Sequence, residues 1–220
     1  ERMKRAILAV SFGTTHADAL ENAIGTVEAR LREEFPGYEV RRAFTSGMVR
    51  TILGRRGAAV DAPEEALDRL AQEGYDEVVV QPTHVIPGEE VEKLAQACQG
   101  RAHLFSRLAM GKPLLAGEAD CLEVARILAA AHAGLPPRVA LVLMGHGSRH
   151  AANGVYERMN ELCSSKGFPH IFVGTVEARP DVEDVLARVW AAGYRQVRLA
   201  PLLLVAGDHA ENDLAGEDED

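Results

Sequence analysis

Two kinds of apolar pattern alternate along the chain. Short runs such as 5–12 and 138–144 place apolar residues at consecutive positions, which is typical of parallel strands buried on both faces. Longer segments between them repeat an apolar residue every three or four positions, the spacing of a helix with one buried stripe. The first stripe consists of Leu20, Ile24, Val27 and Leu31.

The same pattern predicts the order of the elements. The expected strands span residues 5–12, 38–45, 76–82, 102–109, 138–144, 170–175 and 196–203. After the first stripe, the expected helices span residues 47–56, 63–73, 89–99, 118–133, 150–166 and 181–192. This alternation predicts an α/β protein in which helices flank parallel sheets.

The two halves of the chain resemble each other. At a constant offset of 119 residues, GYDEVVVQPTHVIPGEE (74–90) aligns with GYRQVRLAPLLLVAGDH (193–209) and matches two glycines, a tyrosine and a proline. The starts of the halves, AVSFGTTH (9–16) and VLMGHGSRH (142–150), match more loosely. We therefore expect two similar lobes, 1–136 and 137–220, with an active site in the cleft between them.

The second lobe is the shorter of the two. In the first lobe, a strand at 102–109 and a helix at 118–133 follow the aligned segment. Adding the offset of 119 to residue 133 carries the second lobe to about residue 252, whereas the sequence has 220 residues. We therefore expect that the second lobe lacks its last strand and helix, or that these elements are supplied otherwise.

Composition and charge exclude several classes of protein. The net charge of −9, with 24 basic and 33 acidic residues, argues against a nucleic-acid partner. The three cysteines have no CxxC spacing, which argues for reduced thiols and against a disulfide framework or zinc site. No run of 18 apolar residues and no secretory leader is visible. A cytoplasmic protein is expected, or a periplasmic one if a leader was removed ahead of Glu1.

The stretch MGHGS places His146 between two glycines, directly after an expected strand. Ligand-binding loops lie at the carboxyl ends of parallel strands, so this histidine is a candidate ligand-binding residue as well as a candidate structural one. The order Gly-His-Gly-Ser is not a nucleophile elbow, and no Gly-Lys-Ser/Thr phosphate loop follows it.

Equivalent positions of the two halves carry different chemistry. Phe12 in the first half corresponds to His146, and Glu90 corresponds to His209. Glu90 can also be a first-turn acid favoured by the helix dipole, and Glu89 is its rival for a functional role. Two imidazoles and a carboxylate suit a borderline divalent ion such as Co²⁺, Ni²⁺ or Fe²⁺ with open coordination positions.

Six motifs carry a resemblance to a known family. They are ILAVSFGTT, RAFTSGM, HVIPGEE, MGHGSRH, GTVEARP and PLLLVAGDHAENDLAGEDED. Together, from about residue 5 to the end, the chain resembles the anaerobic, class II cobaltochelatases of cobalamin biosynthesis. The resemblance implies the two-lobed fold of the ferrochelatases and insertion of Co²⁺ into sirohydrochlorin, giving cobalt-sirohydrochlorin without ATP or an organic cofactor. It also implies that His146 and His209 bind the metal, with Glu90 as their acidic partner.

The resemblance further implies a partner rich in carboxylates, so basic side chains should line the rim of the site. The candidate substrate contacts are Arg149, Phe12 and His84, with Arg41, Arg42 and Lys112 as weaker choices. His84 aligns with Leu203, which also allows a packed position.

The expected partners are sirohydrochlorin and a divalent ion, with no nucleic acid and no membrane. A homo-oligomer is compatible with the sequence, and haem, which some relatives bind at a subunit interface, is not indicated by these motifs. Two other functions stay open: a non-catalytic carrier of metal or tetrapyrrole, and a related chelatase that prefers iron or nickel.

Overall fold

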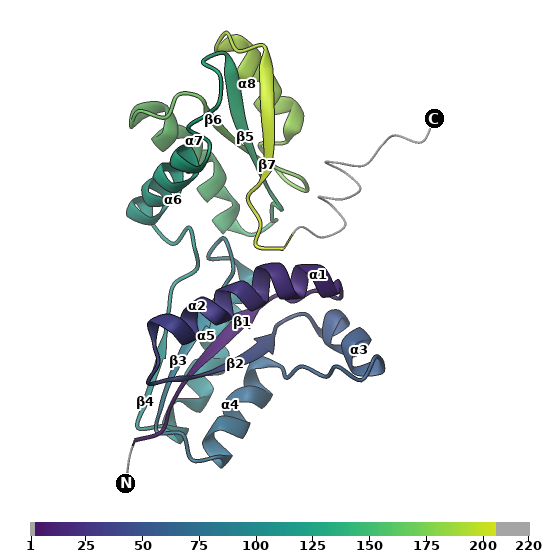
Figure 1. Cartoon of the computed structure of the whole chain (residues 1–220), viewed down its shortest axis with the longest axis vertical. Coiled ribbons are helices and arrows are strands. Elements are labelled where there is room, and N and C mark those ends of the chain that lie inside the picture. The colour runs from purple at the N-terminus through teal and green to yellow at the C-terminus, as the bar shows by residue number, and fades with distance from the viewer. Residues whose placement is uncertain (1–2, 206–220) are drawn as a thin grey trace. The chain divides into compact units, whose positions relative to one another are not determined.

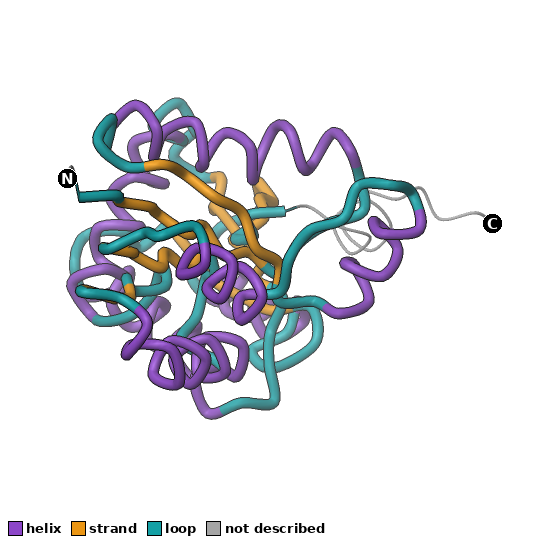
Figure 2. Tube along the Cα trace, turned by 90° about the horizontal axis from the view of Figure 1, so that it is seen from below, coloured by secondary structure: helices purple, strands orange, loops and turns teal. Residues whose placement is uncertain are grey.

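The alternating pattern produces two parallel sheets flanked by helices, as predicted (Figures 1 and 2). The computed structural model describes residues 3–205. Within them, residues 3–84 and 89–113 form one unit (unit 1), and residues 85–88 and 114–205 form a second (unit 2). None of the described helices combines the length and apolarity that crossing a bilayer requires.

Unit 1 contains a four-stranded sheet with the strand order β2-β1-β3-β4, and all its strand pairs are parallel. Its strands are β1 (Arg5–Ser11), β2 (Glu39–Phe44), β3 (Glu77–Pro82) and β4 (Arg107–Met110). Its helical segments are α1 (Ala17–Ala19), η1 (Leu20–Gly25), α2 (Thr26–Glu34), α3 (Gly47–Arg55), α4 (Pro63–Gln72), α5 (Glu89–Arg101) and η2 (Ala102–Leu104).

Alternate residues of β1 pack on opposite faces of the sheet, which explains its uninterrupted apolar run. Leu8 and Val10 belong to a core that includes Leu67 of α4 and Leu94 of α5. Ile7 belongs to a separate cluster on the other face, where Leu31 of α2 packs. Because helices cover both faces, β1 has no polar side chain before Ser11 except at its first residue.

Unit 2 contains a three-stranded parallel sheet with the order β6-β5-β7. Its strands are β5 (Val139–Gly145), β6 (Ile171–Thr175) and β7 (Gln196–Pro201). Its helical segments are α6 (Glu118–Ala131), η3 (Ala151–Asn153), α7 (Gly154–Ser165) and α8 (Val182–Ala191). Side chains of α6 and α7 pack with Leu141 and Leu143, whereas side chains of α8 pack with Val142 on the other face.

The packing divides the chain earlier than the expected boundary after residue 136. Helix α6 contributes Val124 and Ala125 to the core of unit 2, where they pack with Leu141. The segment 85–88 also belongs to unit 2, and the Val85 carbonyl accepts a hydrogen bond from the Leu115 amide at 2.8 Å. An apolar helical stripe does not identify its sheet, so the pattern alone leaves α6 unassigned.

Strand β4 is shorter than the expected 102–109. Residues 102–104 form a single 3₁₀ turn, and the strand begins at Arg107, where it pairs with the first residue of β3, Glu77. Phe105, between the turn and the strand, is buried in the core of unit 1. Phe105 therefore contributes to the core although it lies outside the strand, which is why the apolar pattern predicted a longer strand than the structure has.

The three cysteines are free and buried, as the composition predicts. Burial raises the pKa of Cys98 and of Cys163 to about 11 and also raises the pKa of Cys121. All three are therefore protonated thiols at neutral pH, which is the form that packs as a small apolar side chain.

Candidate functional site

His146 follows the last residue of the central strand of unit 2. Strand β5 ends at Gly145, and the imidazole is about half exposed, at 51% of its side-chain surface. Since β5 and β6 are parallel, the segments that follow them emerge at the same edge of the sheet. The histidine therefore lies where a parallel sheet presents ligand-binding groups.

The two glycines allow close packing on both sides of this histidine. A Cβ at Gly145 would lie 2.5 Å from Cε1 of the buried Tyr156 ring, which comes from α7. Gly147 has a φ of +89°, and a Cβ there would lie 2.8 Å from the Ala178 amide nitrogen. Only glycine satisfies both conditions at low energy, so the flanking glycines are explained by the backbone that positions His146.

The loop after β6 is hydrogen-bonded to this segment. The Gly145 carbonyl accepts from the Val176 amide at 2.9 Å, and the His146 carbonyl accepts from the Glu177 amide at 2.8 Å. These bonds bring the Glu177 carboxylate to the imidazole, with 3.6 Å between Oε2 and Nδ1. A carboxylate beside a metal-binding histidine orients the ring and strengthens its basicity.

The hydrogen bond of Nδ1 determines which imidazole nitrogen can bind a cation. The Gly147 carbonyl lies 3.1 Å from Nδ1, and a carbonyl can only accept, so Nδ1 carries the proton. In the neutral ring, Nε2 then holds the lone pair. His146 is thus prepared to bind a metal, or to accept a proton, through Nε2.

Sequence reasoning missed Glu177 as a partner of His146. The residue lies in the motif GTVEARP, directly after β6, and β6 pairs with β5. One signal for this contact was present in the sequence: GTVEARP and MGHGSRH both follow strands that are expected in the second half of the chain. Their contact depends on the strand order, which puts β6 beside β5.

Glu90 is the second residue of α5 in unit 1. Its rival Glu89 has a side chain 66% exposed and binds Lys93 at 2.8 Å, whereas the Glu90 side chain is 34% exposed and lies 3.8 Å from the same ammonium. Glu89 therefore forms a surface ion pair, and Glu90 is the less exposed of the two carboxylates.

Glu90 acts electrostatically on His84, which follows β3. Burial lowers the pKa of His84 below its usual value, and the Glu90 carboxylate opposes part of this shift. Both ring nitrogens are buried, and neither has a hydrogen-bond partner among residues 3–205. An imidazole in this state is neutral at pH 7 and retains both its donor and its acceptor capacity.

His209, the third residue of the expected metal-binding set, lies outside the described residues. Glu90 is described within unit 1 and His146 within unit 2. Across residues 3–205, no group of three or more His, Cys, Asp or Glu side chains is arranged to hold a metal ion.

Two weaker candidates for substrate contacts make ion pairs within their own unit. Arg42 donates two hydrogen bonds to the buried carboxylate of Glu28, Nε to Oε1 at 2.6 Å and Nη2 to Oε2 at 2.8 Å. Arg41 binds Glu39 through Nε at 2.5 Å and Glu73 through Nη2 at 2.6 Å. Their sequence positions suggested a basic rim, but the contacts give both arginines a structural role.

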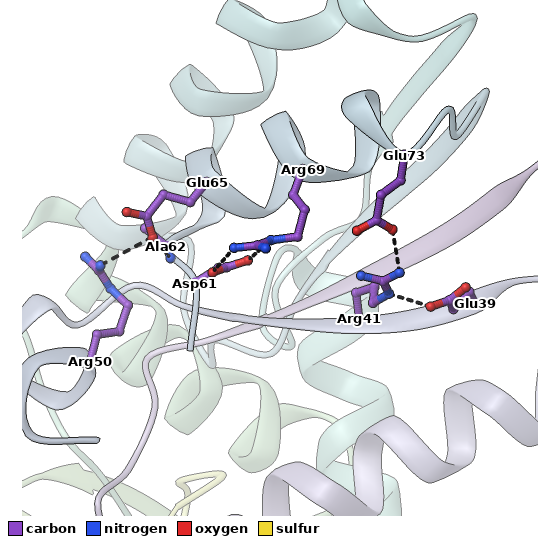
Figure 3. Close-up of polar contacts among 8 residues, drawn as sticks. All are labelled: Glu39, Arg41, Arg50, Asp61, Ala62, Glu65, Arg69 and Glu73. Carbon is purple, nitrogen blue, oxygen red and sulfur yellow. Dashed lines mark hydrogen bonds and ion pairs between the residues drawn. The ribbon is translucent and has the colours of Figure 1, made fainter. Parts of the chain in front are cut away.

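Arg41 is part of a series of ion pairs along α4 (Figure 3). Arg69 of that helix binds Asp61 at 2.8 Å, and Glu65 lies 3.9 Å from Arg50 of α3. Figure 3 shows these side chains following one another along the helix toward Glu73. These ion pairs join α4 and the residue that follows it, Glu73, to β2, to α3 and to Asp61, which precedes α4.

The other candidates are exposed. Arg149 and Lys112 make no ion pair within the described part of the chain, so their charges remain available to an anion. Phe12, directly after β1, is 53% exposed although it is a large apolar ring.

Comparison with known proteins identifies related sequences along nearly the whole chain. A family model described as cobalt chelatase (CbiK) matches residues 5–220. The chain is 39% identical over 219 residues to the sirohydrochlorin cobaltochelatase of Salmonella typhimurium, covering 99% of this chain and 83% of that protein. It is 37% identical over 218 residues to the sirohydrochlorin cobaltochelatase CbiKC of Nitratidesulfovibrio vulgaris, covering 98% and 77%.

A solved structure shows the same fold. SirB from Bacillus subtilis with Fe³⁺ superposes with a TM-score of 0.64 over 97% of this chain and 81% of that chain, at 17% sequence identity. A fold shared at this identity says nothing of the substrate. The family model and the two near-full-length relatives are more specific, and on their evidence the chain belongs to the cobalt chelatase family.

Proposed function

We propose that this chain inserts Co²⁺ into sirohydrochlorin to give cobalt-sirohydrochlorin, without ATP or an organic cofactor. Membership of the cobalt chelatase family supports the reaction, and the relatives from S. typhimurium and N. vulgaris are named for it. The single observation that carries the proposal is the setting of His146, which directly follows the central strand of unit 2, with Nδ1 3.1 Å from the Gly147 carbonyl and 3.6 Å from the Glu177 carboxylate.

The reaction requires two events at the tetrapyrrole nitrogens. Two pyrrole N–H protons must be removed, and water must be stripped from the incoming ion. An imidazole Nε2 can bind a borderline divalent ion and can also accept a proton near neutral pH. We assign the metal to His146 and His209, with Glu177 beside His146, and we assign negative charge and proton acceptance to Glu90.

The reaction is tested by adding full-length protein to metal-free sirohydrochlorin and Co²⁺ and following the absorbance change of metallation. A rate well above the spontaneous one supports the proposal. Tight binding without acceleration would make the chain a carrier, and faster insertion of Ni²⁺ or Fe²⁺ at equal concentrations, with Fe²⁺ handled anaerobically, would assign another metal. Each of these two results contradicts the proposal.

The two carboxylates are expected to respond differently to neutralisation. Glu177→Gln removes the charge beside His146, so we expect the KM for Co²⁺ to rise by about tenfold or more. Glu90→Gln removes a proton acceptor, so we expect kcat to fall by about a hundredfold. Steady-state kinetics with varied Co²⁺ separate the two effects.

Glu183→Gln, at an exposed first-turn position of α8, is the matched control and should leave both constants unchanged. Equal effects of Glu177→Gln and Glu90→Gln on the same constant would contradict the separate roles.

The buried cysteines support a reducing compartment, and we place the protein in the cytoplasm.

A further inference from the structure

The carboxyl edge of the unit 1 sheet carries two large apolar side chains that no core covers. Met48, on the first turn of α3, is 71% exposed, the highest value among the large apolar side chains of residues 3–205, and Phe12 is 53% exposed. Their backbones are linked, because the Phe12 carbonyl accepts a hydrogen bond from the Ser46 amide at 3.1 Å. The two side chains therefore belong to one end of the sheet.

Phe12 is exposed because the surrounding backbone holds it there. Gly13, at a φ of +101°, lies against the ring of Phe44, and a Cβ at Gly13 would lie 2.7 Å from that ring. The next residue, Thr14, is 5% exposed. A backbone fixed on both sides of the turn leaves the Phe12 ring no route into the core.

Met48 is exposed for an equally local reason. The Ser46 hydroxyl caps α3 by accepting a hydrogen bond from the Val49 amide at 3.2 Å. Val49 and Leu53, four positions apart, are the buried residues of this helix. Met48 lies outside that stripe, so the orientation of α3 keeps its side chain in solvent.

Buried polar atoms without hydrogen-bond partners occur on segments that leave the same edge of the sheet. Among the described residues, the buried side-chain nitrogen and oxygen atoms that lack a hydrogen-bond partner are Thr45 Oγ1, Arg50 Nε and both ring nitrogens of His84. Thr45 follows β2, and His84 comes shortly after β3. In the sheet these strands flank β1, after which Phe12 comes. Buried polar atoms are nearly always paired in folded proteins, so unpaired atoms on segments that leave one edge of the sheet point to a ligand.

A cation is held next to the same loop. Arg56 donates from Nη1 to the Thr15 carbonyl at 2.9 Å, which fixes the guanidinium beside the turn that carries Phe12. This exposed side chain makes no other hydrogen bond or ion pair within residues 3–205, so its remaining N–H groups can bind a carboxylate. Apolar side chains next to a cation complement a flat macrocycle with apolar faces and a carboxylate-bearing rim.

We propose that Phe12 and Met48 form a platform that contacts one face of the sirohydrochlorin macrocycle, with Arg56 binding a peripheral carboxylate. This inference rests on the proposed function, because it takes the tetrapyrrole as the occupant. An aromatic ring and a polarisable thioether are both suited to contact a π system. These contacts are made equally by the bound substrate and by the transition state, so they contribute to KM and leave kcat unchanged.

The test compares Phe12→Ala, Met48→Ala and Met48→Leu with the wild type. Phe12→Ala and Met48→Ala are expected to raise the KM for sirohydrochlorin by about fivefold to tenfold, with kcat and the KM for Co²⁺ unchanged. The same factor is expected in the Kd of metal-free sirohydrochlorin, measured by fluorescence quenching without cobalt. Met48→Leu, which keeps the apolar contact, should stay close to the wild type.

Matched controls exist in the same unit. Met3 precedes β1 at the opposite edge and is 52% exposed, and Phe35 after α2 is 48% exposed. Met3→Ala and Phe35→Ala should leave the KM and Kd for sirohydrochlorin unchanged. Equal melting temperatures of the Phe12 and Met48 variants would exclude a folding defect as the cause.

The possible results test the proposed platform and the proposed function independently. If the wild type metallates sirohydrochlorin and the Phe12 and Met48 variants keep its KM and Kd, the platform is wrong and the function stands. If Met48→Ala instead changes the oligomeric state in light scattering with the Kd unaltered, the patch is an interface between copies and the platform is again wrong. If the wild type neither binds nor metallates sirohydrochlorin, both proposals fall.

Discussion

Replacing His146 by alanine is expected to lower kcat/KM for cobalt insertion by about a hundredfold to ten-thousandfold, the range of a lost general base. The variant removes Nε2, the nitrogen that carries the lone pair when Nδ1 donates to the Gly147 carbonyl. It also leaves the Glu177 carboxylate without the ring it lies beside. The loss should appear as a lower kcat together with a higher KM for Co²⁺, because one group serves both steps.

The fold of this variant should be preserved. The imidazole is 51% exposed, and the buried contacts nearby belong to the glycines and to Tyr156, so no core cavity forms. Far-UV circular dichroism and a melting curve check this point. His103→Ala, at an exposed turn of unit 1, is the control and should keep full activity. Wild-type rates in His146→Ala would remove this residue from the mechanism.

The alternation of apolar patterns was sufficient to predict the parallel strands because each signal is local. Strand β5 is buried along almost its whole length, and its run of apolar residues needs no knowledge of its neighbours to be recognised. The position of His146 followed for the same reason, since the residue after a buried parallel strand lies at the carboxyl edge of the sheet.

Features that depend on pairing between distant segments could not be predicted in this way. The contact between His146 and Glu177 exists because β6 lies beside β5, and strand order is not encoded in the periodicity of either strand. Helix α6 has an apolar stripe compatible with either sheet, and only its packing with Leu141 assigns it to unit 2.

The contacts of charged residues with distant segments could not be predicted from the sequence either, as Arg42 shows. In the sequence it is one of two adjacent arginines, a pattern typical of an exposed basic patch. In the structure it forms a bidentate ion pair with Glu28, a carboxylate on α2 that is 3% exposed. The sequence carries no sign that Glu28 turns inward, because acidic residues on amphipathic helices are usually exposed.

Arg42→Ala is therefore expected to lower the free energy of unfolding by about 3 kcal/mol, since it leaves a buried carboxylate without its main partner. Arg32, whose Nη2 lies 3.7 Å from the same carboxylate, keeps the expected loss at the lower end of the range for broken buried pairs. Replacing both residues by apolar ones, as in Arg42→Met with Glu28→Leu, should lower the free energy of unfolding by less, because the buried charge that needs a partner is removed as well.

Urea unfolding followed by far-UV circular dichroism measures the loss, because the single tryptophan, Trp190, lies on α8 of unit 2 and does not report on α2. Arg30→Ala is the matched control: its partner Glu33 lies on the same helix, both side chains are more than half exposed, and such surface pairs contribute little. A midpoint for Arg42→Ala as close to the wild type as that of Arg30→Ala would contradict the structural role of Arg42. It would also return this guanidinium to the candidates for binding the carboxylates of the substrate.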